Sequence, residues 1–169
     1  MQFSFRLMNE ADARAIQAWR YPGEYAVYNA GADDDDPAEM LDRRSPHYTA
    51  RDERGELVGF FAFGTSAAIT GSPEPGIYSE DGGVLIGLGL RPDLTGQGLG
   101  LAFVNAGLAF GREQFAPTAF RLFVMTFNQR AIRVYERAGF QAVGVVMQPN
   151  PRGERPFLEM RRAEQPARR

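Results

Sequence analysis

Glycine occupies every second position from residue 96 to residue 100, in the segment TGQGLG. The apolar run before this segment, VLIGLGL, is typical of a buried strand, and the stretch after it, LAFVNAGLAF, is typical of a helix. A turn between a strand and a helix leaves the first N–H groups of the helix free, at the positive end of its dipole. Because glycine has no Cβ, such a turn can approach a phosphate group closely and bind it.

Three ligands fit such a turn: a dinucleotide, a nucleoside triphosphate and the diphosphate of coenzyme A. The dinucleotide motif needs glycine three residues after Gly98, where the chain has Leu101, and an acidic residue after the next strand, which is missing. The triphosphate loop needs a lysine, and the chain contains none. Coenzyme A remains as the ligand; the alternative is a tight turn without a ligand.

A second pattern, N-x-x-A-x-x-x-Y-x-x-x-G-F, runs from Asn128 to Phe140. Together, the two patterns resemble the GNAT superfamily of acyl-coenzyme A dependent N-acetyltransferases. The resemblance covers the glycine turn with its flanking elements and the second pattern, and more loosely the order of elements along the whole chain. One departure stands at the start of the glycine loop, where the family has glutamine or arginine. Here Thr95 offers a hydroxyl but no charge to a phosphate.

The resemblance implies a place for acetyl-coenzyme A as co-substrate. In the family, two parallel strands splay apart and the pantetheine arm lies between them, a role that falls here on residues 84–90 and 121–126. Gly87 and Gly89 fit a bulge, a close backbone approach or plain packing under the helix. The implied cofactor-binding residues are Leu88, Leu90, Thr95, Gly96, Gln97, Gly98, Leu99, Gly100, Asn128 and Ala131.

Acyl transfer from a thioester to an amine requires a neutral amine, a hydrogen-bond donor for the developing oxyanion and a proton for the departing thiolate. The resemblance makes Tyr135 the proton donor. It makes a backbone N–H near Leu88 or Leu90 the oxyanion donor.

The base that deprotonates the amine is open. Glu80 and Asp81 precede the central strand, and Glu24 lies in an aromatic segment from which it would act through water; carboxylates of pKa about 4 are poor bases. His47 has a better pKa of about 6.5, but we expect an ordinary surface histidine. The same aromatic segment would suit an amine acceptor, a small molecule or a peptide, or would only cover the core; its tyrosines are Tyr21, Tyr25 and Tyr28.

Composition excludes several classes of site. The chain has no cysteine and one histidine, so we expect no disulfide, thiolate nucleophile or metal site. A net charge of −2 argues against nucleic acid and anionic membranes as partners. No apolar run reaches the ~18 residues of a membrane helix, and the first residues lack a signal-peptide pattern. We expect a cytoplasmic monomer or homodimer.

The elements that must position these residues predict an α+β fold. We expect a central, mostly antiparallel twisted sheet of about six or seven strands, splayed between two parallel central strands, with helices on both faces. Residues 1–163 are predicted to form one N-acetyltransferase-like domain, and residues 164–169 a frayed tail. The acidic run 33–36 is interpreted as a helix start. The remaining predicted strands lie at residues 3–7, 47–52, 57–64, 143–147 and 157–161, and the predicted cofactor helix at residues 98–115.

These observations predict an acetyl-coenzyme A dependent N-acetyltransferase that works by direct attack of an amine. A non-catalytic acyl-coenzyme A binding or sensor domain is the alternative; it would keep the glycine loop but would not need the Tyr135 hydroxyl. A structural interaction domain without a ligand is a third hypothesis.

Overall fold

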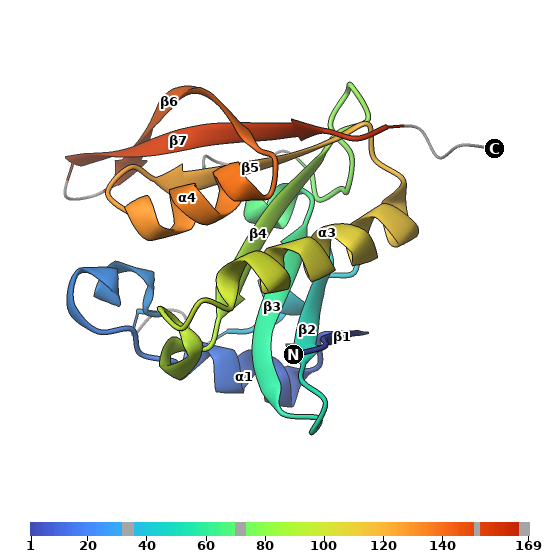
Figure 1. Ribbon diagram of the computed structural model, residues 1–169, viewed down its shortest axis with the longest axis vertical. Coiled ribbons are helices and arrows are strands. Elements are labelled where there is room, and N and C mark those ends of the chain that lie inside the picture. Colours follow the sequence, from blue (N-terminus) through green and yellow to red (C-terminus); the bar gives the residue numbers. More distant parts are fainter. Residues whose placement is uncertain (32–35, 70–73, 151–152, 166–169) are drawn as a thin grey trace.

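The computed structural model describes residues 1–31, 36–69, 74–150 and 153–165. This part of the chain forms seven strands: β1 (Ser4–Leu7), β2 (His47–Arg51), β3 (Leu57–Phe63), β4 (Val84–Leu90), β5 (Ala119–Met125), β6 (Gln141–Asn150) and β7 (Gly153–Ala163). They build one sheet in the order β1-β2-β3-β4-β5-β7-β6 (Figure 1). Neighbouring strands are antiparallel except β4 and β5, which are parallel, so the predicted α+β fold with two parallel central strands is confirmed.

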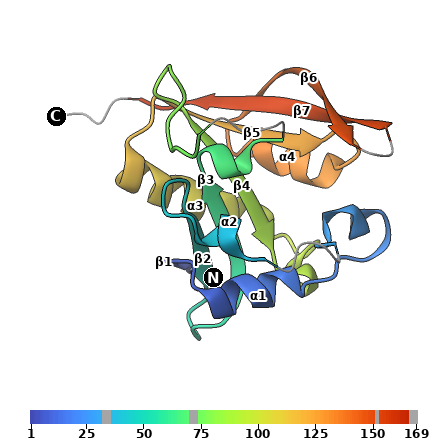
Figure 2. The same cartoon turned by 180° about the vertical axis from the view of Figure 1, so that it is seen from behind.

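Helices cover both faces of the sheet, as predicted. The described helices are α1 (Glu10–Gln17), α2 (Ala38–Leu41), α3 (Gly100–Phe115) and α4 (Gln129–Arg137), with the 3₁₀ turns η1 (Gly23–Tyr28), η2 (Thr65–Ala67) and η3 (Pro92–Leu94). Successive side chains of a strand point to opposite faces. On β3, Phe61 packs with Phe103 of α3, whereas Phe60 packs against Ala13 and Ile16 of α1. The helices α3 and α1 therefore lie on opposite sides, with α1 and α2 toward the viewer in Figure 2.

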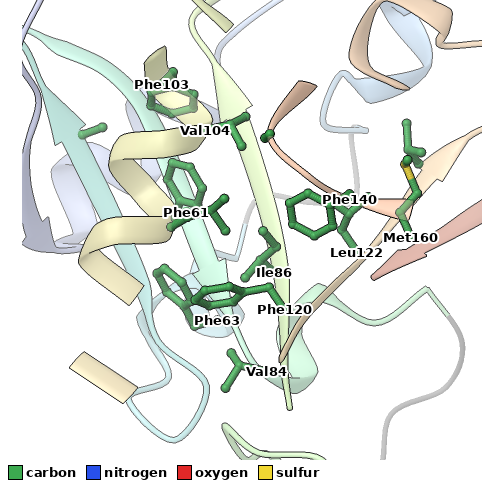
Figure 3. Close-up of a cluster of buried hydrophobic side chains, with 14 of the residues drawn as sticks. Phe61, Phe63, Val84, Ile86, Phe103, Val104, Phe120, Leu122, Phe140 and Met160 are labelled. Carbon is green, nitrogen blue, oxygen red and sulfur yellow. The ribbon is translucent and has the colours of Figure 1, made fainter. Parts of the chain in front are cut away.

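The core under α3 is aromatic (Figure 3). Phe61 and Phe63 of β3 and Phe120 of β5 are fully buried there. On α3, Gly107 faces the Phe61 ring so closely that a Cβ at this position would overlap it. Glycine in mid-helix costs stability, but here it lets α3 pack directly on the sheet.

The strands β4 and β5 are joined only where they begin. Their register pairs Val84 with Phe120 and Leu85 with Arg121, and goes no further within the described sheet. The other edge of β4 stays paired with β3 from Ile86 to Leu90. The two parallel strands therefore separate toward their carboxyl ends, and the predicted splay is confirmed.

The sequence-based boundaries are close for the central elements. Strand β4 has the predicted limits, and α3 begins at Gly100 within the predicted helix 98–115. The last two strands are longer than the predicted 143–147 and 157–161, because they form a long antiparallel hairpin with each other. The β3–β4 register contains no shift, so Gly89 is not a bulge; the Phe60 side chain packs directly against it.

The chain remains anchored just beyond β7. The N–H of Glu164 donates to the Thr118 carbonyl at 2.9 Å, and its carboxylate accepts from the Arg112 guanidinium at 2.8 Å. The tail predicted from residue 164 is thus held at its first residue, and residues 166–169 lie outside the described part. In the acidic run, Asp36 Oδ1 accepts from the Ala38 N–H at 2.9 Å at the start of α2, and residues 32–35 also lie outside it.

Candidate active site

A cleft of about 590 Å³ lies where β4 and β5 separate. On the α3 side it is lined by the loop before α3 and by α4, including Gly98 and Ala131. On the α1 side its lining includes Ile16, Met40 and Phe60. Since these residues come from opposite faces of the sheet, the cleft gives two ligands access to the same gap from two directions.

The glycine loop forms the α3 side of the cleft. Gly96 and Gly98 have positive φ angles of 72° and 79°, which glycine adopts without strain. A Cβ on Gly98 would meet no heavy atom within 4 Å, so the space beside this backbone is open to a ligand. The helix begins at Gly100 without a side-chain cap, which leaves its first N–H groups for an anion. These features fit the diphosphate of coenzyme A.

The backbone of β4 points hydrogen-bond donors into the gap. Arg91 N donates to Val58 O, and Gly64 N donates to Leu85 O. In an antiparallel ladder such bonded positions recur at every second residue, so Gly87 and Gly89 face β3. The N–H groups of Leu88 and Leu90 therefore face the opposite edge, toward the separated β5, where the family resemblance implies an oxyanion donor.

Tyr135 of α4 lines the cleft, half-buried, with its ring at 6.0 Å from the Phe140 ring in an edge-to-face contact. Within the described residues its hydroxyl has no hydrogen-bond partner. Burial raises the pKa of Tyr135, and the neighbouring Tyr28 adds to the shift. The phenol therefore carries its proton at neutral pH.

The aromatic segment from Tyr21 to Tyr28, which contains η1, is bonded to both sides of the gap. The Tyr21 hydroxyl donates to Leu90 O at 2.8 Å, at the end of β4, and burial raises the pKa of Tyr21 to about 12. Asn128 caps α4 by accepting from the Ala131 N–H at 3.1 Å, and its side-chain amide donates to the Tyr28 hydroxyl at 3.0 Å. This segment thus forms part of the wall of the cleft on its α1 side.

Most of the predicted cofactor-binding residues meet in the cleft; those that line it are Leu88, Leu90, Thr95, Gly96, Gly98, Gly100, Asn128 and Ala131. Gln97 and Leu99, also predicted, are not among its lining residues. The Gln97 side-chain amide instead donates to Asp93 O at 2.5 Å, which links the glycine loop to η3.

The structure does not bring the candidate bases to the cleft lining. Glu80 is exposed at the beginning of β4, the end opposite the gap, and Asp81 accepts from the Gly83 N–H at 3.0 Å in the same turn. Glu24 lies on η1 and faces a separate depression beside Phe127 and Arg155. Among the described lining residues there is no carboxylate.

His47 differs from the expectation of a surface histidine. It is 7% exposed, stacks on Phe60 with ring centroids 6.2 Å apart, and lines the α1 side of the cleft. Its Nδ1 is buried without a hydrogen-bond partner in the described part of the chain. The expectation is wrong because residue 47 begins β2 with its side chain turned under α1 and α2, a tertiary arrangement that strand alternation alone does not reveal.

The buried imidazole makes stability depend on pH. Burial lowers the pKa of His47 to about 4 from an ordinary 6.5. Between those values the unfolded chain binds a proton on this residue and the folded chain does not, so the free energy of unfolding falls as pH falls, by up to ~3 kcal/mol. Urea unfolding from pH 7 to pH 4.5 should show a shallower pH dependence in His47→Gln than in the wild type. Parallel curves would contradict this assignment.

Several lining residues carry no signal in the sequence patterns. Trp19, Met40 and Phe60 reach the cleft through the packing of α1 and α2 on the sheet. Arg130 and Arg137 also line the cleft, although they lie at variable positions of the second motif. The only available signal for them is the face of α4 on which they lie. Among the described residues, no group of three or more His, Asp or Glu side chains could hold a metal ion. No helix in the described part of the chain is long and apolar enough to cross a membrane.

Comparison with known proteins agrees with this arrangement. The model of the acetyltransferase (GNAT) family matches residues 12–140. The chain belongs to the GNAT family. The resemblance seen in the two sequence motifs is thereby confirmed.

The GNAT chain is also similar to curated proteins named mycothiol acetyltransferase. It is 38% identical to that of Propionibacterium freudenreichii over 108 residues, which cover 64% of this chain and 29% of the relative. The protein of Salinispora tropica is 32% identical over 139 residues, 76% of this chain and 45% of the relative. The chain thus spans less than half the length of these relatives.

Solved structures show the same fold over nearly the whole chain. AAC(6')-Ib in complex with ribostamycin and coenzyme A has a TM-score of 0.72 at 25% identity, covering 98% of this chain and 95% of that one. A chimera of the spermidine N-acetyltransferase SpeG from Vibrio cholerae has a TM-score of 0.73 at 15% identity, with 96% of each chain covered. The second likeness concerns the fold alone.

Proposed function

We propose that this GNAT protein transfers an acetyl group from acetyl-coenzyme A to the amine of an acceptor by direct attack. One observation carries the proposal: the glycine loop, the inward-facing N–H groups of Leu88 and Leu90 and the Tyr135 hydroxyl all converge on the gap between β4 and β5. An anion site, an oxyanion donor and a proton donor in one cleft are the groups that acyl transfer needs.

Each group then has a defined task. The backbone of the loop from Gly96 to Gly100 would hold the diphosphate, and Asn128 and Ala131 would border the pantetheine arm. Acetyl-coenzyme A supplies the activated acetyl group. The N–H of Leu88 or Leu90 would stabilise negative charge on the carbonyl oxygen, and Tyr135 would give its proton to the leaving sulfur.

The acceptor would enter from the α1 side, because that side of the cleft remains when the glycine-loop side holds the cofactor. Its walls are aromatic and include Trp19, Tyr21 and Phe60. AAC(6')-Ib was solved with ribostamycin, and the curated relatives are named for mycothiol, so a small-molecule amine is the acceptor class we propose. The proposal also places the protein in the cytoplasm, acting without a resident metal.

The identity of the base that deprotonates the amine is also a proposal. Of the predicted candidates, Glu24 lies on η1 next to the cleft-lining Tyr25, whereas Glu80 lies at the far end of β4. We therefore favour Glu24, acting through water, over Glu80. The sensor hypothesis is less well supported, because pure binding gives no reason for a proton-bearing Tyr135 hydroxyl free of protein partners.

Acetyl-coenzyme A should stabilise the fold, since it would bind the folded cleft and not the unfolded chain. At about a hundred times its dissociation constant it should add ~2.7 kcal/mol to the free energy of unfolding. A thermal melt should then show an increase of several degrees, and ATP or NAD at the same concentration should give none. An unchanged melting temperature at millimolar acetyl-coenzyme A would contradict the proposed function.

A further inference from the structure

Arg130, on α4, brings a positive charge close to the glycine loop. It is the second residue of α4 and lines the cleft. Its Nη1 lies 3.4 Å from the position that a Cβ would take on Gly96. The guanidinium is therefore beside the loop backbone, and Arg130 and Gly98 line the same cleft.

This charge is not neutralised by the protein. Most arginines near the sheet are paired: Arg51 with Asp12 at 2.7 Å, and Arg121 with Glu159 at 2.6 Å. Within the described residues Arg130 forms no ion pair and no hydrogen bond. It makes a cation–π contact with Tyr25, whose ring centroid lies 4.3 Å from the guanidinium carbon. An unpaired guanidinium at the edge of a cleft is available to an anionic ligand.

The loop itself supplies no charged group. At its first position Thr95 uses its hydroxyl to donate to Pro92 O at 2.8 Å, so this side chain is engaged in closing η3. A diphosphate held by the loop would meet backbone N–H groups alone. Arg130 is placed to supply the missing charge.

Resting on the proposed function, we propose that Arg130 binds the diphosphate of acetyl-coenzyme A, in place of a charged residue at position 95, and that the Tyr25 ring positions it. Stacking on a ring uses the face of the guanidinium and leaves its N–H edges free to donate to phosphate oxygens. Tyr25 belongs to η1, on the acceptor side of the cleft. A residue of the acceptor side would therefore orient Arg130, which would hold the cofactor.

Three ligands that differ in their phosphates test the assignment: coenzyme A, 3′-dephospho-coenzyme A and acetyl-pantetheine, which has no phosphate ester at all. Affinities are measured by calorimetry for the wild type, Arg130→Gln and the control Arg133→Gln, an exposed arginine of the same helix outside the cleft. Arg130→Gln should weaken both nucleotide ligands at least about tenfold, the usual loss for a charge-assisted hydrogen bond, and leave acetyl-pantetheine unchanged. Arg133→Gln should change none of them.

The outcomes separate the two proposals. Unaltered coenzyme A affinity in Arg130→Gln, with binding intact in the wild type, would overturn the role of Arg130 alone. A loss seen with coenzyme A but not with the 3′-dephospho form would place Arg130 at the 3′-phosphate and overturn the diphosphate assignment. A wild type that binds none of the ligands would overturn the proposed function itself.

The positioning role of Tyr25 has its own readout. Tyr25→Phe keeps the ring and should preserve coenzyme A affinity, whereas Tyr25→Leu removes the ring face and should weaken it about threefold or more, within the range of a partly exposed cation–π contact. Combined with Arg130→Gln, Tyr25→Leu should cause no further loss, because its effect acts through Arg130. Additive losses in the double variant would show that Tyr25 does not position Arg130.

Discussion

Replacing Tyr135 with phenylalanine is expected to slow acetyl transfer by at least about a hundredfold, within the ~10²–10⁴ range for loss of a general acid, while coenzyme A affinity changes little. The substitution keeps the ring and its contact with Phe140 and removes only a hydroxyl that has no protein partner among the described residues. Single-turnover rates are the appropriate measurement, since slow product release would mask a loss in the chemical step.

Tyr48→Phe is the matched control for this experiment. Tyr48 loses the same atom, but it lies on β2 outside the cleft, with its ring packed edge-on against Phe63 and Phe110. Its single-turnover rate should equal that of the wild type. Should Tyr135→Phe also retain the wild-type rate across the pH range, Tyr135 would be a packing residue and another group would protonate the sulfur.

Replacing Gly98 with glutamate is expected to weaken acetyl-coenzyme A binding at least about a hundredfold. The new side chain would occupy the open space beside the loop and place a negative charge where the diphosphate would bind. Calorimetric titration of the folded variant measures the loss directly.

Gly55→Glu separates ligand exclusion from backbone strain. Gly55 has the same positive φ of 79°, and a Cβ on it would likewise meet no heavy atom within 4 Å, but it lies in the turn between β2 and β3. Both variants should lose similar stability, and only Gly98→Glu should lose the ligand. Equal acetyl-coenzyme A affinities in the two variants would show that the glycine loop is a turn that does not bind the diphosphate.

The fold was largely predictable because its central elements carry local signals. The apolar run 84–90 and the glycines after it specify a buried strand, a turn and a helix by short-range rules alone. The hairpin of β6 and β7 is longer than predicted, since exposed polar residues such as Gln141 and Glu154 extend it without the apolar alternation that marks a half-buried strand.

The site was predictable where it depends on motifs and not where it depends on tertiary packing. Tyr135 and Asn128 lie in a contiguous pattern on one helix, and they reach the cleft as expected. His47 and Phe60 lie on the paired strands β2 and β3, and both line the α1 side of the cleft, which depends on the packing of α1 and α2 on the sheet. The proximity of Arg130 to Gly96 likewise joins residues far apart in the chain, a relation that no single-sequence pattern encodes.

The most direct test of acetyl transfer in this cleft is to measure free coenzyme A thiol and acetylated amine together, with a panel of small-molecule amines and acetyl-coenzyme A. The proposal predicts that at least one amine yields the two products in equal amounts, with wild-type rates in Gly55→Glu and strongly reduced rates in Gly98→Glu. Thiol release that does not depend on any amine, or intact cofactor binding without acetylated product across the panel, would contradict the proposed N-acetyltransferase activity.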